Sequence, residues 1–211
     1  MKQILSQKEM DHLADVIEEL ESKTDGEIRL MIVGRSSPSG HVQFTVWMAL
    51  LAALSLAMWL VRYEMIFLSG WWLWPALIIA TNLASLVLAR FERVQRGFIP
   101  LSDLRHNVWG RAEVEFHREG LTHTRHHTGV LIFVSLMERQ AVVLADKGIA
   151  DRVKADVWDD VVKLVLLGAR SGRWAEQFES ALRECGKYLR EHFPSTDGKT
   201  NELPNTVIMK D

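Results

Sequence analysis

The chain has 211 residues, of which 48% are apolar and 25% charged, and its formal net charge is −2. This length suits one or two domains, and the charge balance excludes the basic footprint typical of nucleic-acid-binding proteins. The single cysteine, Cys185, excludes an internal disulfide. The average composition hides a sharp division, because two long uncharged segments lie between two charged, water-soluble parts of the chain.

The N-terminal part predicts one helix followed by one strand. Ser6 and Glu9 form a capping box at the start of the helix, and apolar residues then recur at helical spacing up to an Asp-Gly pair at residues 25–26. Residues 27–33 (EIRLMIV) predict a β-strand. A lone helix and strand cannot close a core. We therefore expect residues 1–40 to be the first part of a divided soluble domain.

The two uncharged segments predict a transmembrane hairpin within residues 41–96. About 20 apolar residues in a helix cross a bilayer core, and we expect the spans at about residues 44–61 and 71–89. The alternative is a pair of buried core helices, but the soluble remainder is too small to surround them. Tryptophan and arginine side chains are expected at the membrane interfaces, namely Trp47, Trp59, Trp71, Trp72, Trp74, Arg90, Arg93 and Arg96.

The distribution of positive charge predicts the orientation of this hairpin. Lys23, Arg29 and Arg35 precede the first span and further arginines follow the second, whereas the connecting loop holds only Arg62. By the positive-inside rule, the soluble segments and both termini should face the cytoplasm. The expected location is the plasma (inner) membrane, with two spans and the lipid bilayer as one partner.

The chain after the hairpin predicts a helix and a strand pair. Residues 104–116 carry apolar side chains at helical spacing, after Ser102 or Asp103 as a cap. Residues 128–136 (TGVLIFVSL) are typical of a buried strand, and residues 141–145 (AVVLA) form the second strand of a hairpin.

Two more helices complete the second part of the domain, which we place at residues 97–193. A long helix is expected to begin at Asp151, and a final helix carries apolar residues from Trp174 to Leu189. Residues 194–211 are expected to be a polar, loose C-terminal tail. The element order predicts an α/β (α+β) sandwich with a small mixed sheet of three or four strands and helices packed on it.

The segment TGVLIFVSLMERQAVVLADKGI, residues 128–149, resembles the central strand pair of TPM domains. These domains are named for thylakoid lumen, photosystem II repair and levamisole-receptor-modulator proteins. In that family an N-G-V-L-L-like strand leads through an acidic/Arg turn to a second strand that ends near a glycine. The order of elements also matches over about residues 5–35 and 101–193, and the transmembrane hairpin is an insertion relative to the simplest members.

The resemblance implies an αβα sandwich and a role in assembly, repair or modulation of membrane protein complexes. For some members it also implies a phosphatase activity, and acidic residues with a divalent cation are associated with the fold. Many members follow the second strand with G-x-G-[LIV]-E. This chain has Asp146-Lys147-Gly148-Ile149-Ala150 there, so it keeps one glycine and lacks the glutamate.

Acidic residues and histidines near the strand pair are the candidate metal ligands. Asp146 and Asp151 offer oxygen ligands to Ca²⁺ or Mg²⁺, although acids at a helix start also favour the helix dipole. His123, His126 and His127 lie in the loop before the central strand, and imidazole suits zinc. The spacing of a structural zinc site is absent, so a solvated loop is the alternative. No other cofactor is expected.

Three charged residues are candidates for contact with an anion or a partner. They are Arg125 in the histidine-containing loop, and Glu138 and Arg139 in the strand turn. A salt bridge within the turn is the alternative for the last two. The sequence contains no Gly-rich phosphate loop, G-x-S-x-G, H-E-x-x-H or C-x-x-C motif.

The leading hypothesis is a membrane-anchored, non-catalytic TPM-like module. It would dock on another membrane protein or on its own copy, and act in assembly, maintenance or modulation of a membrane protein complex. Enzyme activity stays open, since the first alternative is a divalent-metal-assisted phosphatase that uses Asp146. The second alternative is a metal-binding sensor that uses the loop histidines.

Overall fold

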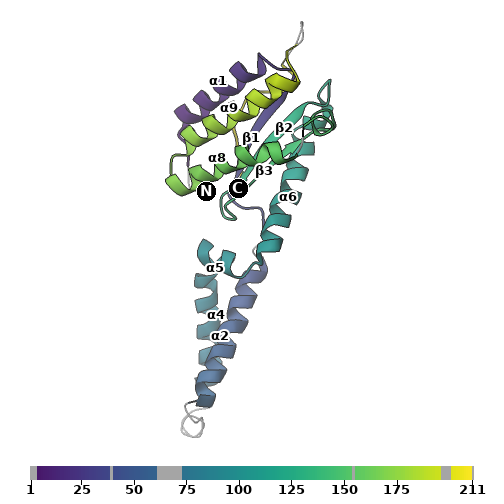
Figure 1. The fold of residues 1–211 in the computed structure, drawn as a ribbon. Helices are drawn as coiled ribbons and strands as arrows, with labels where there is room; N and C mark the ends of the chain where they lie inside the picture. The colour runs from purple at the N-terminus through teal and green to yellow at the C-terminus, as the bar shows by residue number, and fades with distance from the viewer. Residues whose placement is uncertain (1–3, 39, 61–72, 154, 196–200, 211) are drawn as a thin grey trace. The chain divides into compact units, whose positions relative to one another are not determined.

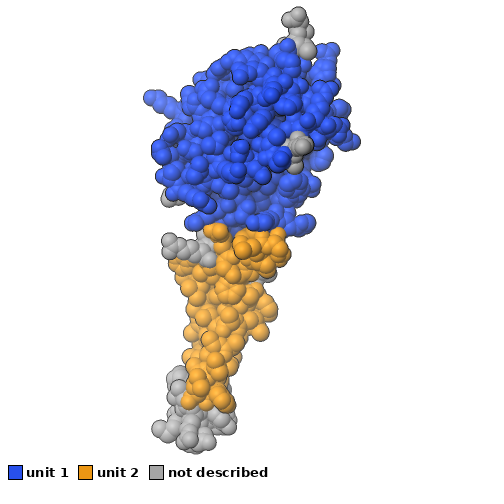
Figure 2. Space-filling view, in the orientation of Figure 1, with its two compact units in different colours: residues 1–36, 105–211 blue, residues 37–104 orange. Residues whose placement is uncertain are grey.

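The computed structural model describes residues 4–38, 40–60, 73–153, 155–195 and 201–210. Contacts divide the chain into two compact units (Figure 2). Unit 1 consists of residues 1–36 and 105–211, and unit 2 consists of residues 37–104. Unit 1 is therefore built from both ends of the chain, and unit 2 is inserted between them.

A four-stranded mixed sheet forms the centre of unit 1, with the strand order β3-β2-β1-β4. β1 (Glu27–Val33) has the bounds expected from the sequence, and β2 (Gly129–Ser135) and β3 (Gln140–Ala145) are close to them. β1 pairs in parallel with β2 and with β4 (Ile208–Lys210), whereas β2 and β3 form an antiparallel hairpin. β2 of the hairpin thus lies beside a strand from the N-terminal part of the chain, and β3 lies on the far side of β2.

Three helices cover one face of the sheet, and Figure 1 shows α1, α9 and α8 together on that side. α1 (Gln7–Glu21) begins at the predicted capping box, in which the Ser6 hydroxyl accepts from the Glu9 N–H and the Glu9 carboxylate accepts from the Ser6 N–H. α8 (Trp158–Ser171) and α9 (Trp174–His192) complete the layer. The main core lies between these helices and the alternate residues Ile28, Leu30 and Ile32 of β1.

The other face of the sheet packs against α6 (Leu101–Arg118). Met31 and Val33 of β1 and Phe133 of β2 form a second core with α6 residues such as Phe116. Helices on both faces make unit 1 an α+β sandwich with a small mixed sheet, which confirms the part of the expected fold class that concerns the soluble domain.

Two expectations for the C-terminal part are wrong. The tail is not loose over its last described residues, because β4 pairs with β1 and the Gly34 N–H donates to the Lys210 carbonyl over 2.9 Å. The long helix does not begin at Asp151. A short helix α7 (Lys147–Ala150) and a 3-10 turn η2 (Ala155–Val157) come first, and α8 begins at Trp158. The buried residues Ile149 and Val153 continue the apolar spacing into this irregular stretch.

Unit 2 contains the apolar helices α2 (Gly40–Leu60) and α4 (Leu73–Leu88), followed by the short α5 (Glu92–Gly97). α2 and α4 pack side by side (Figure 1). Within the described residues, one helix, Val42–Leu60, is long and apolar enough to cross a membrane, and the apolar helix Trp74–Leu88 is shorter. The expected connecting loop at residues 62–70 lies outside the described residues.

Candidate functional site

The β2–β3 turn holds Glu138 inside the fold. Its side chain is fully buried, its Oε1 accepts from the Ser36 N–H over 3.0 Å, and its Oε2 accepts from the Ser135 hydroxyl. The turn also contacts the segment after β1, because the Met137 N–H donates to the Gly34 carbonyl over 3.0 Å. Glu138 therefore links the hairpin to the segment after β1, which is a structural role.

Arg139 and Arg125 lie at opposite ends of β2. Arg139 is exposed in the turn after β2, with a left-handed φ of 53°. Arg125 is exposed before the start of β2, and its backbone N–H donates to Glu202 over 2.8 Å. The structure does not bring these two predicted anion contacts together, because a seven-residue strand separates them.

Asp146 serves as the N-cap of α7. Its Oδ1 accepts from the Lys147 N–H over 2.8 Å, and its Oδ2 lies 3.0 Å from Nδ1 of His127. Asp151 follows the other end of the same short helix and is exposed. Across the part of the chain that the structure describes, no group of three or more His, Cys, Asp or Glu side chains is arranged to hold a metal ion. Among the described residues, Asp146 and Asp151 therefore do not belong to a group of three possible metal ligands.

The loop histidines also make contacts with different residues. His123, His126 and His127 are all exposed. His127 bonds to Asp146 and has a left-handed φ of 54°, whereas the Nδ1 of His123 lies 3.2 Å from the Thr122 hydroxyl. A 3-10 turn, η1 (Leu121–His123), starts this loop.

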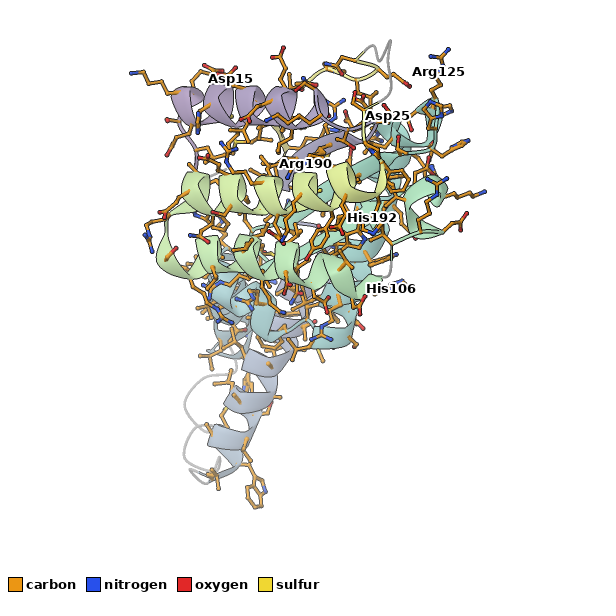
Figure 3. The ribbon with its side chains drawn as sticks, turned by 45° about the horizontal axis from the view of Figure 1, so that its top comes forward. Asp15, Asp25, His106, Arg125, Arg190 and His192 are labelled. Carbon is orange, nitrogen blue, oxygen red and sulfur yellow. The ribbon has the colours of Figure 1, made fainter. Side chains whose placement is uncertain are left out.

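A cleft of about 430 Å³ lies at the end of the sheet where β1 and β2 begin. Figure 3 shows Asp25 and His192, which both line it, at the same end of unit 1. Gly148 is required in its wall, because an added Cβ would lie 2.5 Å from the His126 carbonyl oxygen and 2.7 Å from that of His127. The lining comes from four separate stretches of chain: Asp25, His126, Thr128, Gly148, Arg152, His192, Phe193 and Pro194.

Two cleft side chains have their orientation set by neighbours in the fold. The Arg152 guanidinium lies 5.2 Å from the centre of the Phe193 ring, which is a cation–π contact. The Nδ1 of His192 lies 3.0 Å from the Tyr188 carbonyl, so Nδ1 carries the proton and donates it. The cleft is therefore lined by a guanidinium, an imidazole and Asp25, a set that can bind a polar ligand group. Sequence reasoning missed Asp25, Arg152 and His192 as neighbours, because they are far apart in the chain.

The expected membrane-interface residues differ in exposure. Trp59 is 72% exposed and Trp74 is 38% exposed, whereas Trp47 is half-buried. Arg90 is exposed and Arg96 is half-buried. Trp71 and Trp72 lie outside the described residues, and of Arg93 only the backbone, within α5, is described.

Among solved structures, the fold of this chain is similar to that of a bacterial protein. No family model and no curated protein matches the chain. The NMR structure of the BA42 protein from the psychrophilic bacterium Bizionia argentinensis sp. nov. is similar, with a TM-score of 0.61 and 21% sequence identity. The match covers 99% of this chain and 97% of that chain. At this identity the likeness shows the fold alone, and the TPM resemblance stays a prediction.

Proposed function

We propose that the protein is a membrane-anchored, non-catalytic TPM-like module that acts in assembly, maintenance or modulation of a membrane protein complex. In this proposal residues 44–61 and 71–89 cross the plasma (inner) membrane as a helical hairpin. Unit 1 and both termini lie in the cytoplasm, where unit 1 docks on another membrane protein or on a second copy of the chain.

The exposure of apolar side chains on α2 and α4 is the observation that carries the membrane anchor. Only 17% of the most apolar stretch of Val42–Leu60 is buried, and Phe44, Leu60 and Ile79 are 61%, 66% and 59% exposed. Water-soluble proteins rarely expose contiguous apolar surface of this extent. Helices, which satisfy their own backbone hydrogen bonds, are the form in which such surface enters lipid.

The hydrogen bonds of two buried carboxylates, Asp146 and Glu138, support a docking role rather than catalysis. Both oxygens of Asp146 contact the start of α7 and His127, and both oxygens of Glu138 are engaged by Ser36 and Ser135. These acids hold backbone and side-chain groups of the protein itself. The resemblance to TPM domains, with its implied role in membrane complexes, points the same way.

Two measurements on cells test this proposal. The first is membrane fractionation with carbonate extraction, together with a cytoplasm-specific reporter fused at the C-terminus. The proposal expects the chain to stay in the extracted membrane and the reporter to be active. The second is in-cell cross-linking followed by affinity purification, which should capture a membrane protein or a second copy. Recovery of the chain in the soluble fraction, or of a monomer alone after cross-linking, would contradict the anchor or the docking role respectively.

A metal-assisted phosphatase is a second candidate, because the cleft is lined by Gly148, two residues after Asp146. The detergent-solubilised protein would be assayed on p-nitrophenyl phosphate with Mg²⁺ or Ca²⁺. Asp146→Asn is the informative variant, since asparagine caps a helix as well as aspartate does. Activity that this variant abolishes would favour the phosphatase, and activity that it leaves unchanged would rule out Asp146 as a metal ligand.

A further inference from the structure

The stretch of chain that follows the apolar helix α4 carries exposed apolar side chains beside arginines. Phe91 and Phe98 flank α5 at its two ends, and Leu101 begins α6. These three side chains are 57%, 39% and 71% exposed. Arg90 is exposed directly before Phe91, and Arg96 lies in the last turn of α5. All five residues belong to unit 2, and large apolar side chains gathered in this way are unusual on a surface that faces water.

Local hydrogen bonds hold α5 against the end of α4. The Gln95 side-chain amide donates to the Ala89 carbonyl over 2.8 Å, and the Phe91 N–H donates to the Leu88 carbonyl over 3.1 Å. Carbonyl groups at a helix C-terminus have no partner within the helix, so these bonds complete the end of α4. In the proposed hairpin, α5 therefore begins where the second span meets the lipid headgroups.

Two buried N–H groups of unit 2 have no acceptor among the described residues. They are Nε of Arg96 and Nε1 of Trp47, which lies in the first half of α2. A buried donor without an acceptor costs free energy, so both groups are suited to an acceptor supplied from outside the protein. The phosphate and ester oxygens of a phospholipid are acceptors of this kind.

The charges of this stretch favour an anionic ligand. Residues 90–104 contain three arginines and two acids, namely Arg90, Arg93, Arg96, Glu92 and Asp103. Asp103 lies in the first turn of α6, where an acid is favourable next to the helix dipole. Arg90 and Arg96 form no ion pair with any side chain that the structure describes. Their guanidinium groups therefore keep their charge and their donors for a ligand.

We propose that residues 90–101 form a binding surface for anionic phospholipids on the cytoplasmic side of the membrane. Phe91, Phe98 and Leu101 enter the boundary between headgroups and acyl chains, as in other segments that lie in the interface. Arg90 and Arg96 bind the headgroup phosphates. A zwitterionic lipid carries its own cation beside the phosphate, which competes with an arginine, whereas an anionic lipid does not and attracts arginine to the surface.

This inference rests on the membrane anchor proposed above and names the class of lipid that the anchor selects. Lipid is the occupant because the surface continues directly from α4, whose exposed apolar side chains, such as Ile79, form part of the anchor. The arginines complement the charge of an anionic headgroup. The exposed phenylalanines and the buried donors then meet the two parts of one ligand, its acyl chains and its oxygens.

The first experiment measures the lipid selectivity of the full-length chain in mild detergent. The protein is incubated with equal amounts of phosphatidylglycerol and phosphatidylcholine that have the same acyl chains, and the lipid retained after gel filtration is quantified by mass spectrometry. The wild type should retain phosphatidylglycerol at least about fivefold over phosphatidylcholine. The double variant Arg90→Gln and Arg96→Gln should lower this ratio to less than about twofold, because both charges are removed.

Arg170→Gln is the matched control, because Arg170 is an exposed arginine in the last turn of α8. It should leave the ratio unchanged. Equal retention of the two lipids by the wild type, or a preference that the double variant keeps, would overturn the proposal. A large excess of inorganic phosphate should not release the lipid beyond what chloride of the same ionic strength releases. Specific release by phosphate would show a site for a soluble anion and would also overturn it.

The second experiment locates the surface in vesicles of the same two lipids. A nitroxide label on Phe98→Cys should collide with oxygen rather than with a water-soluble nickel complex. Leu167→Cys, at a 46% exposed leucine of α8, should show the reverse. The native Cys185 should stay unlabelled, because it is buried and burial raises the pKa of its thiol to about 12. Access of the nickel complex to residue 98, or dipolar broadening that reveals a second copy there, would overturn the proposal.

The anchor and this lipid surface fail in different ways. Release of the chain by carbonate extraction would contradict the anchor and the lipid surface together. A chain that stays in the extracted membrane but retains the two lipids equally would contradict the lipid surface alone. The docking role of unit 1 depends on neither of these lipid measurements.

Discussion

Nζ of Lys210 lies 2.7 Å from Oε2 of Glu115, and this ion pair ties the last described residue of the chain to the C-terminal turn of α6. The Glu115 side chain has no exposed surface, so its charge requires compensation within the fold. Arg111 contributes a second contact at 3.0 Å, and Lys210 also bonds to Glu119 at 2.8 Å. The short strand β4 is therefore held by charge as well as by backbone pairing with β1.

Removal of the Lys210 charge should destabilise unit 1. We expect Lys210→Met to lower the free energy of unfolding by about 2 kcal/mol, because it leaves the buried Glu115 carboxylate with less compensation. Chemical denaturation followed by circular dichroism measures the effect. The matched control is Lys163→Met, which breaks an exposed pair with Asp160 and should lower the free energy of unfolding far less, because solvent screens that pair. Equal losses in both variants would show that the Lys210 pair has no special role.

The same ion pair predicts a dependence of stability on pH. Burial raises the pKa of Glu115, but the hydrogen bonds and charges of Lys210 and Arg111 outweigh it and hold this pKa below 4.5. The stability from Glu115 is therefore complete above about pH 4.5 and is lost as the pH falls through the lower folded pKa. The difference in unfolding free energy between the wild type and Lys210→Met should shrink between pH 5 and pH 3. A difference that stays constant over this range would contradict the assignment.

At high pH the stability that the Lys210 ion pair contributes should be lost as the pH rises, whereas at low pH it is lost as the pH falls. The hydrogen bonds to Glu115 and Glu119 raise the pKa of Lys210 above 10.5. Its contribution is complete below about pH 10.5 and is lost as the pH rises through the folded pKa. Denaturation of the wild type and Lys210→Met at pH 9 and pH 11 should show the difference narrowing at pH 11, and a wider difference there would count against the pair.

A methyl group at residue 148 should strain the wall of the cleft. Gly148→Ala brings a Cβ to 2.5 Å from a backbone oxygen, so we expect a loss of about 1–3 kcal/mol of stability. Gly110→Ala is the control, because its Cβ would meet nothing within 4 Å in helix α6. That change should stabilise the protein by up to about 1 kcal/mol. Thermal unfolding of the two variants and the wild type ranks them directly.

The two charged residues of the β2–β3 turn should behave differently. Glu138→Ala removes the acceptor of the Ser36 N–H and the Ser135 hydroxyl, and we expect it to cost about 2 kcal/mol. Arg139 has a φ of 53°, which glycine adopts freely, so Arg139→Gly should keep or slightly raise stability. Denaturation curves measure both. If Arg139 contacts a partner, capture of that partner by Arg139→Gly should fall although the fold is intact.

Much of unit 1 could be predicted because its signals are local. The capping box at Ser6 and the strand EIRLMIV produced element positions that the structure confirms. The strand pair was also found, because two apolar runs separated by a short polar turn are typical of a hairpin. In each case the residues that determine the element lie within a few positions of one another.

The sequence did not predict β4 or the cleft, because both depend on contacts between distant parts of the chain. β4 has three residues and pairs with β1 in parallel, so no local pattern distinguishes it from a loose tail. Likewise, Arg152, His192 and Asp25 meet in the cleft only after the two parts of the chain have packed. The start of α8 was misplaced for another reason, because the buried residues Ile149 and Val153 imitate a continuous helical period.

The strand order also sets the sequence of events during synthesis. β1 has both of its neighbours later in the chain, one at residues 129–135 and the other at residues 208–210. A growing chain therefore presents an apolar strand without a partner while the whole of unit 2 emerges. Loss of the last three-residue strand would remove one neighbour of β1 and leave Glu115 without one of its countercharges.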